Sequence, residues 1–195
     1  MSLVIAVKKD GVVYFGADTQ ATYGRGERRS HLNKENLKIK VLPNGIILGR
    51  VGSVHSLQHV WAHSEWFTIP EDGVLTKRHV VTEIVPKIYE CYRDGDLFEK
   101  DGTERPLSTG DAFLLGYRDK LFWINHRLGV VQVEHCVAIG AGSSFVQYGL
   151  SHMDMEKPVI KEMKRLLQVG AECAPSVSGP FAFTDTATCK IKIER

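Results

Sequence analysis

Three histidines at regular spacing are the first residues whose types and positions suggest chemistry. His55, His59 and His63 follow one another at intervals of four residues, which places them on one face of a helix. Two histidines four residues apart can share a metal ion. The glutamate of an HExxH zinc motif is missing, because Ser, Leu and Gln separate the first two histidines. We therefore predict a polar outer stripe opposite Val60 and Trp61, and no metal site.

Cysteine could supply a nucleophile or a zinc ligand. The four cysteines stand far apart, with no CxxC pair, at Cys91, Cys136, Cys173 and Cys189. A zinc cage is therefore not expected. The N-terminal residues lack the basic region and apolar core of an export signal. We predict a cytoplasmic protein whose cysteines are reduced, buried, structural thiols.

Aromatic residues that lie close together in the sequence could form a ligand platform. They are Trp61, Trp66, Phe67, Phe122 and Trp123. Aromatic side chains contribute much of the apolar area of cores and interfaces. We therefore predict that this group packs in the core and at a subunit interface.

The composition excludes several classes of function. Of the 195 residues, 43% are hydrophobic and 25% are charged, which is typical of one globular domain, here 1–195. The net charge of +2 gives no general attraction to nucleic acid or to anionic membranes. No apolar run reaches the ~18 residues of a membrane span. A GxxxxGKS/T loop and a strand-linked GxGxxG are both missing from the sequence, so no nucleotide cofactor is expected.

Runs of strand pattern alternate with pairs of helix patterns along the chain. The sequence begins with a predicted hairpin around Asp10 and Gly11, since Asp-Gly is a strong hairpin signal. A second hairpin is predicted around Asn44 and Gly45. Helices are predicted at 53–67, 76–92 (with Pro86 as a candidate kink), 144–152 and 158–174, further strands at 112–117, 121–125, 130–133, 181–184 and 188–193, and polar loops at 23–34 and 94–110. This order favours two antiparallel sheets packed together, with helix pairs on the outside.

Four segments resemble one known family in the family's own order. Residues 7–24, which end in Asp-Thr-Gln-Ala-Thr-Tyr-Gly, resemble the opening of proteasome β subunits and are nearest to the bacterial ring peptidase HslV. Residues 37–42 resemble the strand that carries the active-site lysine of that family. Residues 48–52 and 138–143 resemble its two glycine turns. The chain is identified as a proteasome β-type, HslV-like member of the N-terminal-nucleophile hydrolases.

The resemblance implies both a fold and a nucleophile. The fold is α+β, a four-layer αββα sandwich with two antiparallel sheets. The first residue of the mature chain is the nucleophile, and its own α-amine is the general base. Counting back along the hairpin, this position falls on Ser2 once Met1 is removed. An α-amine suits the role because its pKa lies near ~8.

The resemblance also implies roles for four further residues. Lys38 would lower the pKa of the amine and favour the alkoxide. Asp18 would hold the lysine in place. The backbone N–H of Gly49 would supply the oxyanion hole. Ser178 matches the serine of the Asp-x-x-Ser-Gly segment of the family.

Three positions depart from the pattern of the family. The usual nucleophile is threonine, and Ser2 lacks its methyl group. Ala141 stands where the second glycine turn has a serine, so one hydrogen-bonding partner of the terminal amine is missing. Pro175 occupies the place of an aspartate, for which Glu172 is a candidate substitute. These departures favour a second hypothesis, a catalytically weakened or inert proteasome-like structural or interaction protein.

The leading prediction is a proteasome-like N-terminal-nucleophile peptidase that hydrolyses peptide bonds inside a homo-oligomeric ring. Its substrates would be peptides or unfolded proteins, any ATPase would be a separate chain, and neither nucleic acid, membrane, cofactor nor metal is expected. The apolar residues Ala21, Ile47 and Val51 near the expected primary pocket favour cleavage after an apolar residue. A third hypothesis is an amidase that acts on a small, non-protein substrate with the same nucleophile.

Overall fold

The N-terminal hairpin forms around the turn that the sequence predicts. In the computed structural model, which describes residues 2–23, 28–31, 37–94 and 111–194, β1 (Leu3–Lys9) pairs antiparallel with β2 (Val12–Asp18). Asp10 and Gly11 between them have φ angles of 50° and 76°, as a type I′ hairpin turn requires. The sheet has the order β10-β1-β2-β11-β12. Its other strands are β10 (Cys136–Gly140), β11 (Phe181–Asp185) and β12 (Lys192–Glu194).

A second five-stranded sheet has the order β5-β6-β7-β8-β9, and all of its neighbouring strands are antiparallel. Its strands are β5 (Ile39–Val41), β6 (Ile47–Val51), β7 (Ala112–Tyr117), β8 (Lys120–Ile124) and β9 (Val130–Gln132). The five residues of β6 are all buried. A strand buried on both faces lies in the interior of a layered protein.

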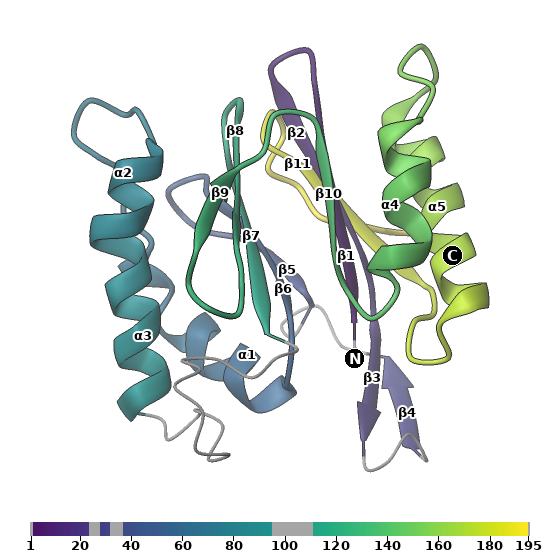
Figure 1. Ribbon diagram of the computed structural model, residues 1–195, viewed down its shortest axis with the longest axis horizontal. Coiled ribbons are helices and arrows are strands. Elements are labelled where there is room, and N and C mark those ends of the chain that lie inside the picture. Colours follow the sequence, from purple (N-terminus) through teal and green to yellow (C-terminus); the bar gives the residue numbers. More distant parts are fainter. Residues whose placement is uncertain (1, 24–27, 32–36, 95–110, 195) are drawn as a thin grey trace.

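Apolar side chains fill the space between the two sheets. Val4 and Phe15 of the first sheet pack in one cluster with Ile47 and Leu114 of the second. The helices α4 (Ser143–Ser151) and α5 (Val159–Cys173) pack against the first sheet. The second sheet packs against the helical segments of residues 54–94. Figure 1 shows the two groups of helices on opposite sides of the strands.

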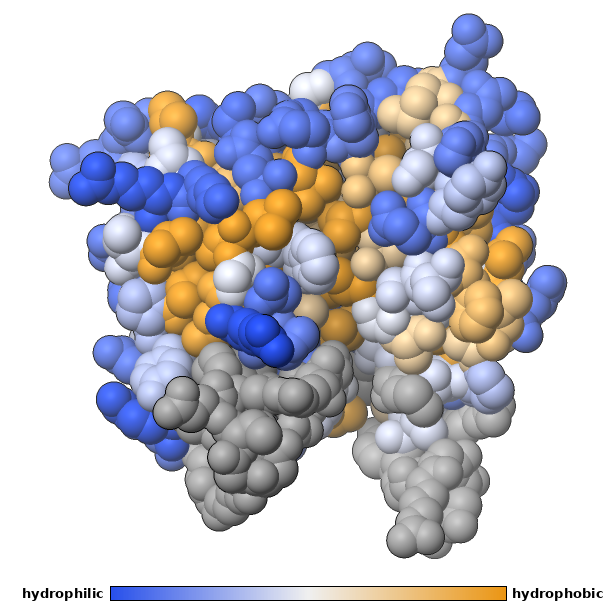
Figure 2. Space-filling view, viewed as in Figure 1, coloured by the Kyte–Doolittle hydropathy of each residue, from blue (hydrophilic) through white to orange (hydrophobic). Residues whose placement is uncertain are grey.

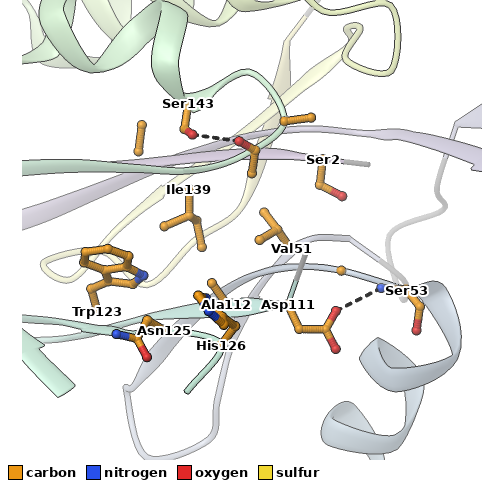
Figure 3. A pocket seen from close by; sticks show the side chains of 14 residues that line it. Ser2, Val51, Ser53, Asp111, Ala112, Trp123, Asn125, His126, Ile139 and Ser143 are labelled. Carbon is orange, nitrogen blue, oxygen red and sulfur yellow. Dashed lines mark hydrogen bonds between the residues drawn. The ribbon is translucent and has the colours of Figure 1, made fainter. Parts of the chain in front are cut away.

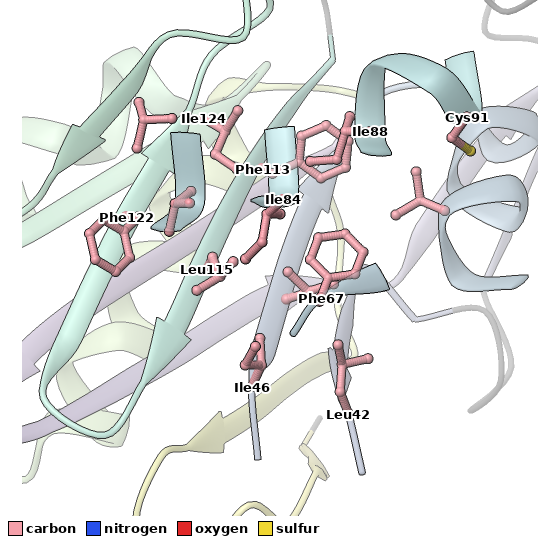
Figure 4. Close-up of a cluster of buried hydrophobic side chains, with 14 of the residues drawn as sticks. Leu42, Ile46, Phe67, Ile84, Ile88, Cys91, Phe113, Leu115, Phe122 and Ile124 are labelled. Carbon is pink, nitrogen blue, oxygen red and sulfur yellow. The ribbon is translucent and has the colours of Figure 1, made fainter. Parts of the chain in front are cut away.

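Aromatic and aliphatic side chains join the second sheet to its helices (Figure 4). Phe67, Ile84 and Ile88 lie in one buried cluster with Leu115 and Phe122. Trp61 belongs to the same cluster, and Trp66 packs at its margin. The prediction that the aromatic residues serve the core is therefore confirmed for Trp61, Phe67 and Phe122.

The helices of residues 54–94 begin and change pitch where the sequence indicates. They are α1 (Val54–Ala62), the 3-10 turn η2 (Ser64–Trp66), α2 (Lys77–His79), the π-helical turn η3 (Val80–Ile84) and α3 (Val85–Asp94). The Ser53 hydroxyl caps α1 by accepting the N–H of Ser56 at 3.0 Å, as expected of an N-cap serine. The π turn ends just before Pro86. Proline has no N–H and clashes with the carbonyl four residues earlier, so a wider turn accommodates it.

The structure contains strands that the sequence analysis missed. β3 (Gln20–Tyr23) pairs with β4 (Arg28–His31) as a separate two-stranded sheet, where we predicted a solvated loop. β10 pairs with β1 in a segment for which the sequence predicts only a glycine turn. The last strand covers Lys192–Glu194 instead of 188–193, because Cys189 has a φ of 51° that no strand residue adopts. The predicted loop at 94–110 lies, apart from Asp94, outside the described residues.

Within the parts of the chain that the structure describes, no helix has the length and apolar character needed to span a membrane.

Candidate active site

A buried ion pair lies where the first hairpin meets the second sheet. Asp18 is the last residue of β2, and Lys38 immediately precedes β5. Lys38 Nζ lies 2.7 Å from Asp18 Oδ2, and the two side chains are 4% and 0% exposed. Lys38 Nζ also donates a hydrogen bond to the backbone oxygen of Gln20 at 2.6 Å. Lys38 therefore points into the protein. The alternation of inward and outward side chains along a strand would equally have allowed it to face solvent.

Burial and pairing act on this pair in opposite directions. Burial raises the pKa of Asp18 above its usual value, and the Lys38 ammonium opposes that shift. Burial lowers the pKa of Lys38, and the Asp18 carboxylate opposes that shift. Removing two charges from water is costly, and even a well-formed buried pair seldom returns a net gain in stability. A pair of this kind is therefore a candidate for a functional role.

Asp18 links the ion pair to the residue that we predict as nucleophile. Asp18 Oδ1 accepts the backbone N–H of Leu3 at 2.8 Å, and this N–H belongs to the peptide bond that joins Ser2 to Leu3. Ser2 is 5% exposed, and its carbonyl accepts the N–H of Ala141 at 2.8 Å. Gly140 permits this approach, since a Cβ there would lie 2.0 Å from the Ser2 oxygen. The structure thus brings Ser2, Asp18 and Lys38 together.

Ser2 lines a pocket of about 640 Å³, a volume within the range of ligand sites. The pocket lies where the ends of β6, β7, β8 and β10 meet the start of the chain (Figure 3). Its lining is Ser2, Val51, Gly52, Ser53, Asp111, Ala112, Trp123, Asn125, His126, Ala138, Ile139, Gly140, Ala141 and Ser143. Of the apolar residues predicted for a primary pocket, only Val51 belongs to this lining. Ile47 instead lies in the core between the sheets.

The glycine beside Ser2 is Gly52, and the prediction of Gly49 as oxyanion donor requires correction. Gly49 lies within β6, which is paired on both sides by β5 and β7, so its N–H runs along the sheet. A Cβ at Gly49 would lie 2.8 Å from Val4, which gives it a role in the close approach of the two sheets. Gly52 follows the end of β6, has a φ of 132° and lines the pocket with Ser2.

A buried polar network that the sequence analysis missed holds the residues around Gly52. Arg50 is 0% exposed; its guanidinium lies 3.2 Å from Asp111 Oδ2 and donates to the carbonyl of Ser53 at 3.0 Å. Asp111 Oδ1 accepts the N–H of Ser53 at 3.2 Å. The Tyr92 hydroxyl donates to Asp111 Oδ2 at 2.7 Å, and burial raises the pKa of Tyr92. The available signal was an arginine inside an otherwise apolar strand, since buried arginines require partners.

Among the described residues, the link between Ser178 and the ion pair runs through Gln20. The Ser178 hydroxyl donates to Gln20 Oε1 at 2.6 Å, and Gln20 Nε2 donates to the carbonyl of Pro175 at 3.3 Å. The N–H of Gln20 meanwhile donates to Asp18 Oδ2 at 3.2 Å. Gln20 is the glutamine of the segment that resembles proteasome subunits. The sequence therefore contained a signal for this residue, although no role was predicted for it. Glu172, the candidate substitute for the aspartate of the family, is exposed near the end of α5.

The three histidines predicted as a polar stripe make two separate ring contacts. His55 and His59 meet edge to face with ring centroids 4.8 Å apart, whereas His63 stacks on Trp66 at 4.1 Å. Among the described residues, no group of three or more His, Cys, Asp or Glu side chains is arranged to hold a metal ion.

Of the cysteines, only Cys91 is buried, so the prediction of four buried thiols is wrong for the other three. Burial raises the pKa of the Cys91 thiol.

Comparison with known proteins gives matches in structure and none in sequence. No protein-family model matches the chain, and no curated protein matches it. BPH from Thiobacillus denitrificans has a TM-score of 0.70 at 18% identity, over 94% of this chain and 96% of that one. An Anbu (Gly-1) mutant from Hyphomicrobium sp. strain MC1 has a TM-score of 0.68 at 15% identity, over 98% and 85%. HslV from Trypanosoma brucei has a TM-score of 0.63 at 14% identity, over 94% and 98%.

These structural neighbours are HslV-like proteasome subunits and the proteasome-like Anbu, and they cover most of the chain. The predicted resemblance is therefore confirmed at the level of the fold, a mixture of helices and antiparallel sheets.

Proposed function

We propose that the chain is a proteasome-like N-terminal-nucleophile peptidase in which Ser2, after removal of Met1, is both nucleophile and general base. The observation that carries this proposal is the buried pair of Lys38 and Asp18, hydrogen-bonded to the peptide unit that follows Ser2. An ion pair this deeply buried is weak evidence for stability. Its place beside a serine that lines a pocket gives it a chemical use.

The geometry supports acyl transfer to Ser2. The α-amine takes the proton of the Ser2 hydroxyl while Oγ attacks the peptide carbonyl carbon, and the same proton then passes to the leaving amine. Water hydrolyses the resulting ester. Lys38 is paired with Asp18 as a cation and does not itself act as the base. Its positive charge favours the unprotonated α-amine and the ionised hydroxyl of Ser2. The N–H groups around Gly52 are the candidate donors to the developing oxyanion, and the Arg50–Asp111 network would hold them in place.

The proposal includes the wider architecture. The two sheets with helices on opposite sides support a four-layer αββα sandwich formed by one domain over 1–195. We propose a homo-oligomeric ring in the cytoplasm that takes peptides or unfolded proteins, supplied by a separate ATPase where one is used. Figure 2 shows apolar side chains exposed on one face, over β8 and β9. Val131 on β9 is 44% exposed, and Phe145 and Tyr148 on α4 are 51% and 74% exposed, which suits burial between subunits.

A second function, an inert proteasome-like structural protein, is favoured by one observation. Ala141 cannot supply the hydroxyl that the family places beside the terminal amine, and the nearby Ser143 hydroxyl donates to the carbonyl of Gly140 at 2.7 Å. The amine of Ser2 would then lack one of its polar supports.

Turnover of fluorogenic peptides decides between these functions. The wild type, with a free Ser2 amine verified by N-terminal sequencing, should hydrolyse a peptide mixture, and Ser2→Ala and Lys38→Ala should not. Equal turnover in all three proteins would refute the mechanism. Failure of the verified wild type to hydrolyse any peptide would favour the inert protein. Light scattering on the same samples tests the ring, which a monomer at micromolar concentration would contradict.

A further inference from the structure

Gln20 is hydrogen-bonded to two distant parts of the chain, through its main chain and through its side chain. Its N–H donates to Asp18 Oδ2 at 3.2 Å, and its carbonyl accepts the Lys38 ammonium at 2.6 Å. Its side-chain amide contacts residues 175–178, which precede β11. Gln20 is 2% exposed, and a buried amide is costly unless it is hydrogen-bonded. The amide therefore depends on the partners that residues 175–178 supply.

The carbonyl of Pro175 decides which way the Gln20 amide points. Gln20 Nε2 donates to this carbonyl at 3.3 Å and to Thr22 Oγ1 at 3.2 Å, so both of its hydrogens are used. A carbonyl can only accept, which places Nε2 and not Oε1 beside Pro175. Oε1 then lies 2.6 Å from the hydroxyl oxygen of Ser178, and an amide oxygen can only accept. The Ser178 hydroxyl is therefore fixed as the donor.

The amide of Gln20 makes these contacts at the position where the resemblance places an aspartate. The proline that stands there has no polar atom in its side chain, and Glu172, the candidate substitute, is exposed. Among the described residues, the link between residues 175–178 and the ion pair runs through Gln20. The same residue presents its carbonyl to Lys38. Partners that hold the amide in place therefore also hold the carbonyl against the lysine.

The Gln20 carbonyl stabilises the charge on Lys38. Burial lowers the pKa of Lys38 and the Asp18 carboxylate opposes that shift. A hydrogen bond to the charged form also opposes it, and the Gln20 carbonyl accepts one from the ammonium. In the proposed mechanism, the α-amine of Ser2 is the other titratable group beside Lys38. If the carbonyl moved away, the ammonium would be held less firmly and would lower the pKa of this amine less.

We propose that Gln20 is a positioning residue of the active site. Its side-chain amide, anchored on the Ser178 hydroxyl and the Pro175 carbonyl, holds its main-chain carbonyl on the Lys38 ammonium. Gln20 acts through Lys38 and provides a support that the proline side chain at position 175 cannot give. This inference rests on the proposed peptidase activity for its effect on turnover, but not for its effect on Lys38 itself.

The kinetic test is a double-mutant cycle between Gln20 and Ser178. Gln20→Met keeps the length of the side chain and removes its amide, and Ser178→Ala removes the hydroxyl that anchors this amide. Each variant should lower kcat/KM at neutral pH by about fivefold, the scale of one hydrogen bond. Each should also move the acid limb of the pH profile to higher pH, because the pKa of the α-amine rises.

The double variant Gln20→Met/Ser178→Ala should have the kcat/KM of Gln20→Met alone, since both changes break the same chain of contacts. Ser178→Ala, which removes a smaller and less buried group, keeps the inference testable if Gln20→Met fails to fold. Losses of kcat/KM that add in the double variant, or that occur with the acid limb unmoved, would overturn the inference.

Gln147→Met is the matched control. The Gln147 amide also joins two elements, because its oxygen, on α4, accepts the N–H of Ala138 on β10 at 2.8 Å. Among the described residues, none of its hydrogen bonds reaches the ion pair. Its effect on kcat/KM should add to that of Ser178→Ala, and the acid limb should stay in place. An acid limb that moves as far in this control as in Gln20→Met would contradict a specific role of Gln20.

A titration of Lys38 separates this inference from the peptidase proposal. The Ser2→Ala protein, labelled with ¹³C at the lysine Cε atoms, is titrated by NMR, and the Lys38 resonance is assigned through its loss in Lys38→Met. The pKa of Lys38 should be lower in Ser2→Ala/Gln20→Met than in Ser2→Ala, and unchanged in Ser2→Ala/Gln147→Met. This result would support the role of Gln20 even if the wild type proves to have no turnover. The same pKa of Lys38 in all three proteins would overturn the inference, whatever the turnover of the wild type.

Discussion

Asp18 accepts hydrogen bonds on both carboxylate oxygens, from Lys38 Nζ at 2.7 Å and from the backbone N–H of Leu3 at 2.8 Å. The second bond fixes the start of β1 relative to the ion pair. A substitution at Asp18 or Lys38 therefore alters a hydrogen bond of the peptide unit that joins Ser2 to Leu3.

Removing one member of the pair should be more damaging than removing both. Lys38→Met leaves the Asp18 carboxylate buried without its cation, which should lower the free energy of unfolding by about 3–5 kcal/mol. The double variant Asp18→Asn/Lys38→Met has no uncompensated charge and should regain most of that loss. Urea unfolding of the three proteins measures these differences. A double variant no more stable than Lys38→Met would show that the pair does not behave as a buried ion pair.

The pair should also give the stability a characteristic dependence on pH. The folded pKa of Asp18 lies above its usual value. Between the usual pKa and the folded pKa, the folded state binds more protons than the unfolded state, so the free energy of unfolding falls as pH rises. The folded pKa of Lys38 lies below its usual value. Between the folded pKa and the usual pKa, the unfolded state binds more protons than the folded state, so the free energy of unfolding rises with pH.

Urea unfolding of the wild type and of Asp18→Asn/Lys38→Met, from about pH 4 to about pH 10, tests both windows. The free energy of unfolding of the wild type minus that of the double variant should fall with pH at the acid end and rise with pH at the alkaline end. A difference that stays constant across the whole range would contradict the burial of these charges.

The network behind Gly52 gives a prediction about catalysis at a distance. Tyr92→Phe removes the hydroxyl that donates to Asp111 and should cost about 1.5–3 kcal/mol of stability, as for a hydrogen bond to a charged group. Because Asp111 also holds the N–H of Ser53, we expect kcat to fall more than KM changes. Tyr148→Phe on α4, where the side chain is 74% exposed, should change stability by less than about 0.5 kcal/mol. Equal effects of the two variants on kcat would argue against a positioning role for the network.

Local signals in the sequence were sufficient for the elements that depend on local chemistry. The Asp10–Gly11 turn, the Ser53 cap and the apolar spacing of α5 each follow from residues only a few positions apart. The ion pair followed from the resemblance, because Asp18 and Lys38 occupy its aligned positions. β3 and β4 were missed because their residues are largely polar, and pairing between two such strands leaves little periodic signal.

The errors at the site have a different cause. Two glycines within four residues, Gly49 and Gly52, could each follow a strand, and only the length of β6 decides which one reaches the pocket. Arg50 and Asp111 lie 61 residues apart in the chain, so no local pattern links them.

The most direct test of the central claim is to trap the acyl group on Ser2. A peptide ester is mixed with the wild-type protein whose Met1 has been removed, the reaction is quenched with acid, and the N-terminal peptide is analysed by mass spectrometry. The account predicts an acyl adduct on Ser2 that disappears in Ser2→Ala and is strongly reduced in Lys38→Met. An adduct on any other residue, or turnover that continues in Ser2→Ala, would contradict it.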